Sequence, residues 1–157
     1  MTFRVLTCAI AAATGVATAL FAAGHTTPEG QVVAARNAQM TLYGYHVGLL
    51  GNMAKGEVPY DADLARSTAE FLAAMAGASQ DQLWVPGTEQ GVVDGSRAKA
   101  DIWTDPDGFA AELARFSEAT QALANAAGEG LESMQGALGP VGRGCGSCHD
   151  AYRGPRN

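Results

Sequence analysis

Near the end of the chain, residues 145–149 read Cys-Gly-Ser-Cys-His. Cys-x-x-Cys-His is the attachment signature of c-type haem, in which two thiols form thioethers to the haem and the histidine ligates its iron. On a helix, Cys145, Cys148 and His149 fall at positions i, i+3 and i+4, so their side chains share one face. A neutral imidazole is a good iron ligand, and its second nitrogen stays free for an orienting hydrogen bond. The motif predicts one haem c, attached through Cys145 and Cys148 and ligated by His149.

Three other interpretations of this motif have less support. A structural zinc site needs four ligands, and the remaining cysteine and histidines, Cys8, His25 and His46, are not paired at metal-ligand spacing. A thioredoxin-like redox motif belongs beside a βαβ pattern, and no strand pattern precedes residue 145. A plain structural disulfide would not need the histidine. Haem attachment is therefore the preferred interpretation.

The first 24 residues have the pattern of a secretory signal peptide. Arg4 precedes an uncharged apolar run from Val5 to Ala23, and small residues at 22–24 are typical of a cleavage site. The alternative is a membrane anchor, but alanine, glycine and threonine dilute the hydrophobicity of the run. We expect cleavage before His25, a single domain over 25–157, export to the periplasm and no stable membrane anchor afterwards. Cys8 would be removed with the peptide.

The chain is acidic, with a formal net charge of −6 that becomes more negative when Arg4 is removed. Such a charge argues against binding to nucleic acid or to anionic lipid. We therefore expect redox partner proteins that present basic surfaces.

The apolar residues of the mature chain recur at spacings of three and four, which predicts an all-α fold. Four helices are expected at about 28–54, from an N-cap at 61 to about 77, from an N-cap at 105 to about 127, and at about 129–152. The expected buried stripes comprise Val33, Met40, Tyr43, Val47 and Leu50; Leu64, Phe71, Leu72 and Met75; Phe109, Leu113, Phe116 and Leu123; and Leu131, Met134, Leu138, Val141, Cys145, Cys148 and Tyr152. Two short connections and a long link over 80–103, expected to be without helical periodicity, predict an antiparallel up-down-up-down four-helix bundle with covalently bound haem. Glycines and Pro140 weaken the last helix, where a kink is expected.

The ligand on the other side of the iron decides whether the haem transfers electrons or binds small molecules. In this bundle the end of the last helix lies beside the start of the first. Met40 lies about 15 Å into the first helix, within reach of a haem held at residues 145–149. Met75 is the second candidate, and a methionine on an apolar stripe is also a common core residue. From the pattern alone, Met40 remains one of several choices.

The haem motif and the segments around it resemble the class II cytochromes c, the cytochrome c prime family. The resemblance covers nearly the whole mature chain and includes Arg36 and the segments 55–61, 84–89, 102–103 and 145–153. It implies a periplasmic four-helix bundle, often a homodimer paired through the first two helices. Met40 matches the family's distal position, which holds a methionine ligand in low-spin members and a bulky apolar residue in high-spin members. Arg36 matches a position near the haem propionates.

Two functions follow from the resemblance. The first is a one-electron carrier whose low-spin haem is ligated by His149 and Met40. The alternative is a high-spin cytochrome c prime-like protein that binds nitric oxide or carbon monoxide at an open distal site. No constellation of acid, base and nucleophile is evident, so an enzyme is not expected.

Overall fold

The computed structural model describes residues 27–156. The predicted signal peptide at 1–24, Cys8 and the expected start of the domain at 25 lie outside these residues. Among the helices of residues 27–156, none is long and apolar enough to cross a membrane.

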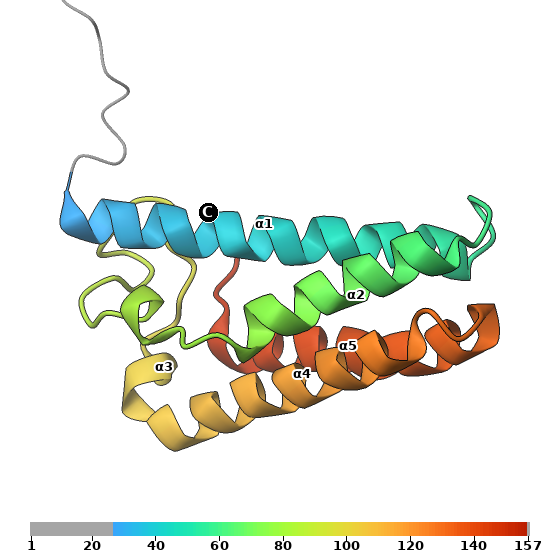
Figure 1. Cartoon of the computed structure of the whole chain (residues 1–157). Helices are drawn as coiled ribbons and strands as arrows, with labels where there is room; N and C mark the ends of the chain where they lie inside the picture. The colour runs from blue at the N-terminus through green and yellow to red at the C-terminus, as the bar shows by residue number, and fades with distance from the viewer. Residues whose placement is uncertain (1–26, 157) are drawn as a thin grey trace, which may run out of the picture.

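Four long helices form the predicted bundle: α1 (Pro28–Ala54), α2 (Ala62–Gly77), α4 (Pro106–Ala126) and α5 (Leu131–Tyr152) (Figure 1). α4 packs against both α2 and α5, and α1 packs against α2 and α5. Over residues 27–156 no strand forms, and the extended backbone makes only an isolated bridge between Ala98 and Arg153. The all-α four-helix prediction is confirmed.

The helix starts follow the capping residues of the sequence. The Thr27 side chain accepts a hydrogen bond from the Gly30 N–H, and Pro28 occupies the first turn of α1. Asp61 caps α2, and Asp105 caps α4 ahead of Pro106. A capping oxygen satisfies an N–H that has no partner within the helix, and proline at the first position loses no hydrogen bond.

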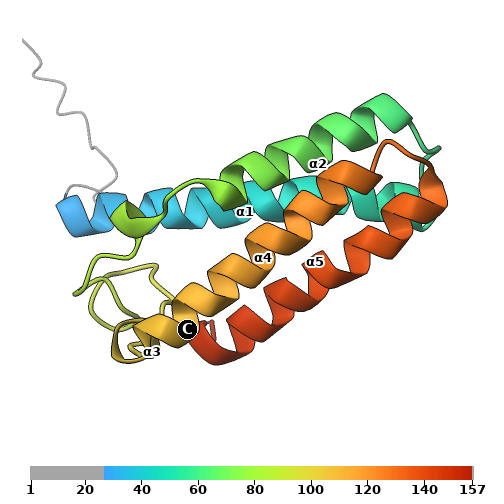
Figure 2. The same ribbon diagram turned by 60° about the horizontal axis from the view of Figure 1, so that its bottom comes forward.

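The long link between α2 and α4 contains two short helices that the sequence pattern did not predict. They are the 3-10 helix η1 (Asp81–Leu83) and the single-turn helix α3 (Asp101–Thr104). A helix of one turn is too short to show an apolar period, so contacts with the rest of the fold determine the conformation of these segments. Figure 2 shows the link gathered at one end of the bundle, beside the start of α4 and the end of α5.

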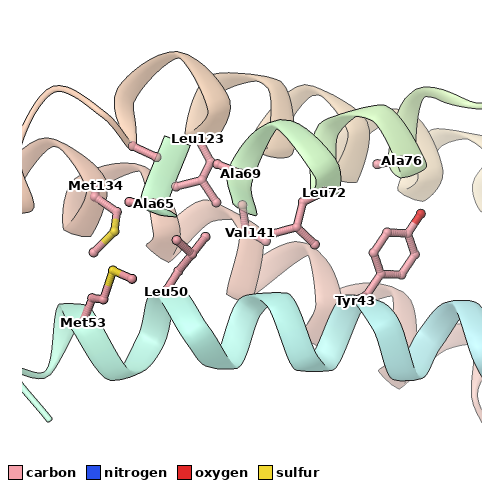
Figure 3. Close-up of a cluster of buried hydrophobic side chains, with 11 residues drawn as sticks. Tyr43, Leu50, Met53, Ala65, Ala69, Leu72, Ala76, Leu123, Met134 and Val141 are labelled. Carbon is pink, nitrogen blue, oxygen red and sulfur yellow. The ribbon is translucent and has the colours of Figure 1, made fainter. Parts of the chain in front are cut away.

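The core runs along the inside of the bundle, where aliphatic side chains of all four long helices meet (Figure 3). Leu50, Leu72, Leu123, Met134 and Val141 are fully buried. These residues belong to the predicted stripes, which are therefore largely confirmed.

Three predicted stripe residues are instead exposed. Leu64 and Phe71 of α2 are 46% and 40% exposed, and Leu131 of α5 is 37% exposed. The small residues Ala65, Ala69 and Ala76 of α2 take the buried positions, because their size allows α2 to approach α4 closely. The predicted buried face of α2 is therefore wrong for Leu64 and Phe71 and correct for Leu72.

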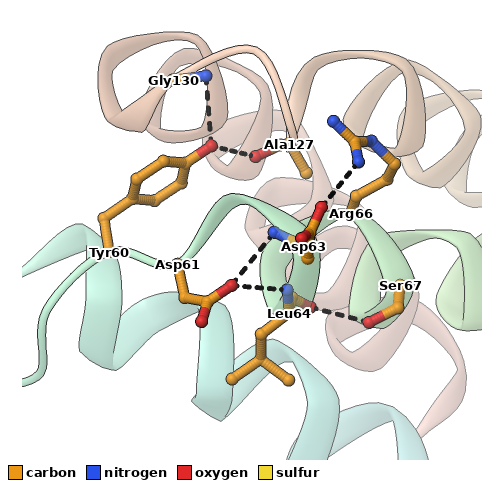
Figure 4. Close-up of polar contacts among 8 residues, drawn as sticks. All are labelled: Tyr60, Asp61, Asp63, Leu64, Arg66, Ser67, Ala127 and Gly130. Atoms are coloured by element: carbon orange, nitrogen blue, oxygen red, sulfur yellow. Dashed lines mark hydrogen bonds and ion pairs between the residues drawn. The ribbon is translucent and has the colours of Figure 1, made fainter.

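Hydrogen bonds join the two connections at the end of the bundle opposite the link (Figure 4). Tyr60, just before α2, donates its hydroxyl to the Ala127 carbonyl at 2.8 Å and accepts from the Gly130 N–H at 3.1 Å. The connection between α1 and α2 is thereby tied to the connection between α4 and α5.

Candidate haem site

A mainly apolar cavity of about 470 Å³ lies between α1, the link, α4 and α5. Its volume falls within the range of about 300–1,000 Å³ typical of small-molecule and cofactor sites. All the residues that the sequence assigned to the site line this cavity: Arg36, Met40, Cys145, Cys148 and His149. The structure therefore brings together residues from the two ends of the chain.

α5 contributes both cysteines and the histidine from its last turns. Cys145 and Cys148 are free thiols and half-buried. Burial raises the pKa of the Cys148 thiol to about 11, with further contributions from the charges of Glu112 and Cys145. Burial also lowers the pKa of His149, helped by the positive charges of Arg153 and Arg97. The imidazole is thus favoured in its neutral form, which is the form that ligates a metal.

The end of α5 is held firmly against the link and the start of α4. The Tyr152 hydroxyl donates to Asp105 Oδ2 at 2.7 Å, and the Lys99 N–H donates to the Tyr152 carbonyl at 3.0 Å. Lys99 Nζ also donates to the carbonyls of Asp150 and Ala151. A cation at these carbonyls satisfies groups that the helix leaves unpaired and complements the helix dipole.

A second contact supports the segment between the two cysteines. The Ser147 hydroxyl donates to Glu112 Oε2 at 2.7 Å, and Glu112 also pairs with Arg115 on α4. The hydrogen bonds from Ser147 and Arg115 lower the pKa of the Glu112 carboxyl group. Glu112 lines the cavity, so it places a carboxylate beside the predicted attachment segment. No motif or spacing in the sequence indicated this residue.

Arg36 is almost fully buried on α1 and connects that helix to the link. Its guanidinium donates to the Leu83 carbonyl, to Thr88 Oγ1 and carbonyl oxygen, and to Ser96 Oγ, at 2.9–3.3 Å. The group also lies 4.9 Å from the centre of the Trp84 ring. Within residues 27–156 it pairs with no carboxylate. A buried cation with only neutral partners would gain from a nearby anion.

Met40 lies on α1, on a different helix from the cysteines and His149, and lines the same cavity. Met53 and Met134 are buried together at the end of the core away from Tyr43, as Figure 3 shows. Met75, the second candidate, packs against the core and does not line the cavity. Of the described methionines, Met40 is therefore the one placed at the site.

Further polar residues line the cavity without having been assigned to it. Among them are Tyr43, one turn after Met40, and Gln80 and Trp84 at the start of the link. Tyr43 was recognised only as a stripe residue. The positions of Gln80 and Trp84 depend on the fold of the link, which no sequence period indicates.

The polar groups of the cavity fit a haem with carboxylate substituents. Trp84 Nε1 is a buried donor that has no acceptor among the described residues. A carboxylate is an acceptor for such an N–H and an anion for Arg36. Two thiols, one imidazole and a largely apolar lining complete the set of groups that haem c requires. The residues present therefore suit this cofactor.

Comparisons with known proteins identify the family of this chain. The family model described as cytochrome C′ matches residues 31–153. A cytochrome c-554 from Cereibacter sphaeroides is 42% identical over 78% of this chain and 92% of its own length. A solved cytochrome c′ described as from Rhodobacter spheriodes is 43% identical with a TM-score of 0.79, covering 82% of this chain and 98% of that chain.

Two solved structures of cytochrome c prime variants from Alcaligenes xylosoxidans are also similar. One is a nitric oxide complex and the other is carbon monoxide-bound. Each is 32% identical with a TM-score of 0.71 and covers 83% of this chain and 98% of its own. The chain belongs to the cytochrome c′ family, whose members bind one covalently attached c-type haem.

Proposed function

We propose that this protein is a periplasmic cytochrome c′ that binds nitric oxide or carbon monoxide on the Met40 side of its haem. Cys145 and Cys148 would hold the haem by thioethers, and His149 would ligate it from α5. When bound, the haem supplies an iron centre that can take a small ligand or exchange an electron. No catalytic reaction is part of this proposal.

The observation that carries the proposal is the difference between the two sides of the cavity. His149 on α5 is a strong ligand for iron, whereas α1 presents the thioether of Met40 within a largely apolar lining. An open or weakly held position opposite histidine allows small ligands to bind. The gas complexes of the Alcaligenes variants support the same function for this chain.

The chain's own groups would hold and position the cofactor. Arg36 and Trp84 Nε1 would bind haem carboxylates, and the α5 anchors at Tyr152 and Lys99 would keep the attachment segment in place. The largely apolar lining favours an uncharged ligand, because an ion would lose its hydration there.

A second candidate function is the electron carrier predicted from the sequence. The observation in its favour is that Met40 lines the cavity on α1, away from His149. In this case the thioether would ligate the iron permanently and give a low-spin haem. Partners with basic surfaces would suit the acidic chain of net charge −6.

Replacing Met40 distinguishes the two functions. If gas binds at an open site, Met40→Leu keeps the haem high-spin and nitric oxide still changes the visible spectrum. If Met40 ligates the iron, the wild type is low-spin and only Met40→Leu is high-spin. Met53→Leu is the matched control, because Met53 lies in the core away from the cavity. A wild type that is low-spin and unresponsive to nitric oxide contradicts the main proposal.

We also propose a homodimer formed through α1 and α2. Dimers occur among solved cytochromes c′. The supporting observation is an exposed apolar surface on these two helices, which includes Leu42, Tyr45, Leu64 and Phe71.

A further inference from the structure

One wall of the cavity carries a buried polar cluster formed by Gln39, Tyr43 and Gln80. The side-chain N–H groups of Gln39 and Gln80 both donate to the Tyr43 hydroxyl oxygen, at 3.2 and 3.5 Å. Tyr43 and Gln80 line the cavity, and they are 6% and 7% exposed. The Tyr43 ring packs edge-on against Phe116 with 5.1 Å between ring centres. Packing therefore fixes the hydroxyl at the cavity wall.

The hydrogen bonds within this cluster are incomplete. Among the described residues, the carbonyl oxygens Gln39 Oε1 and Gln80 Oε1 accept no hydrogen bond, although both are buried. Tyr43 accepts two hydrogen bonds and donates to no acceptor in the same part of the chain. A tyrosine hydroxyl has one hydrogen. Turning either amide around therefore satisfies only one of the two carbonyl oxygens.

Burying an acceptor without a donor destabilises the fold, so such groups are usually completed by water or a ligand. Gln80 Oε1 differs from Trp84 Nε1, because it is an acceptor and a haem carboxylate does not satisfy it. The cluster thus needs a small molecule that both donates and accepts, which is the chemistry of water. Its place is the cavity that Tyr43 and Gln80 line.

We propose that Tyr43 and Gln80 form a hydrogen-bonding subsite of the haem cavity, filled by water at rest, in which Tyr43 donates to a bound diatomic ligand. This inference rests on the proposed gas binding. Met40 and Tyr43 are one turn apart on α1, so the hydroxyl is placed on the Met40 side of the cavity. The Met40 thioether is only a weak acceptor, and the Nη groups of Arg36 already donate to the link.

Tyr43 is suited to this task because it keeps its proton. Burial raises the pKa of Tyr43 to about 12. The hydroxyl therefore remains a donor throughout the neutral range, and its binding effect should not change between pH 6 and 9.

The test is the C–O stretching frequency of the reduced, carbon monoxide-bound protein, measured by infrared spectroscopy. A donor to the ligand oxygen lowers this frequency, so Tyr43→Phe should raise it. Loss of one neutral hydrogen bond of about 1 kcal/mol predicts that carbon monoxide dissociates about fivefold faster. Gln80→Leu should change the frequency in the same direction by a smaller amount, because Tyr43 loses one of the two donors to its hydroxyl oxygen and becomes a weaker donor itself.

Tyr60→Phe is the matched control, because Tyr60 makes two hydrogen bonds at the opposite end of the bundle and does not line the cavity. It should leave both the frequency and the dissociation rate unchanged. An unchanged frequency in Tyr43→Phe overturns the subsite.

Failure of the proposed function gives a different result, namely no carbon monoxide complex in the wild type. The subsite is then tested by the same infrared measurement in proteins that carry Met40→Ala, because this substitution opens the position opposite His149. A higher frequency in Met40→Ala/Tyr43→Phe than in Met40→Ala supports the subsite, and equal frequencies overturn it.

Discussion

At the scale of single residues, Arg36 shows how a charge can be buried without an acidic partner. Its guanidinium donates to two backbone carbonyls and two hydroxyls of the link, and no acidic side chain takes part. The planar group reaches these acceptors simultaneously because its N–H groups point in fixed directions. Arg36 therefore organises the link and also remains available to a haem carboxylate.

Arg36→Leu should lower the free energy of unfolding by about 3 kcal/mol, because it removes four buried or part-buried hydrogen bonds between α1 and the link. Arg36→Lys should recover only part of this loss, since a single ammonium cannot reach all four acceptors. Urea unfolding followed by circular dichroism measures both values. Arg143→Leu is the control, because Arg143 is exposed on α5 and its loss should change stability by less than about 0.5 kcal/mol. A similar loss for Arg36→Leu and Arg143→Leu would contradict the role of Arg36.

The raised pKa of Tyr43 predicts that the free energy of unfolding falls at high pH. Its pKa is raised from 10.0 to about 12 by burial, so the folded protein favours the neutral phenol. The stabilisation is complete below pH 10 and is lost as the pH rises through about 12. The pKa of Tyr152 is also raised to about 12, by its hydrogen bond to Asp105, so the wild type should lose both contributions.

The measurement is urea unfolding of the wild type and Tyr43→Phe at pH 8 and pH 11. The variant should lose less stability between the two values than the wild type does. Equal losses would show that Tyr43 does not carry the predicted pKa.

At the scale of helices, α5 is a poor helix by sequence and is held by its surroundings. It runs continuously from Leu131 to Tyr152 even though Pro140 lies inside it, and it contains several glycines. Tertiary packing and the anchors at its end compensate for this composition. The glycines are not equivalent, because some face open space and others face neighbouring groups.

Gly136→Ala and Gly142→Ala should each raise the free energy of unfolding by about 0.5–1 kcal/mol. A new Cβ at either position meets nothing within 4 Å, and alanine favours the helix. Gly108→Ala in α4 should instead destabilise the fold, because its Cβ would lie 2.6 Å from the Tyr152 hydroxyl and would disturb the bond to Asp105. Thermal unfolding compares the three variants. An increase in melting temperature for Gly108→Ala would contradict the proposed anchor.

Apolar spacing and the cysteine–histidine motif are local signals, so they were sufficient to predict the long helices and the attachment residues Cys145, Cys148 and His149. Arg36 and the choice of Met40 depended on the resemblance to a known family. The sequence pattern did not predict which face of α2 is buried, because alanines rather than Leu64 and Phe71 enter the core. It also missed η1, α3 and the contacts of Gln80, because the link is shaped by residues distant in the chain. Arg36 illustrates this limit, since its partners lie 47–60 positions away.

At the scale of the whole molecule, α1 and α2 share an exposed apolar surface composed of Leu42, Tyr45, His46, Leu64 and Phe71. His46 stacks on Phe71 with 4.3 Å between ring centres, and Tyr45 meets His46 edge-on at 5.2 Å. The four apolar members are 40–61% exposed. Such a patch is typical of an interface between protein molecules, and the proposed homodimer would cover it.

Phe71→Glu should shift the protein from dimer to monomer, because it places a charge in this surface. Sedimentation velocity over a range of concentrations measures the change. Val92→Glu is the control, since Val92 is 64% exposed in the link and outside the surface. A wild type that is monomeric at every concentration, or a dimer unaffected by Phe71→Glu, would contradict the α1–α2 interface.

A covalently bound haem with His149 on one side and a site for small ligands on the Met40 side would account for the proposed function of this protein. The most direct test is the visible spectrum of the reduced wild-type protein before and after addition of carbon monoxide. Broad high-spin bands that change to those of a carbon monoxide complex are the predicted result. Sharp low-spin bands that carbon monoxide leaves unchanged would contradict the claim and favour an electron carrier ligated by Met40.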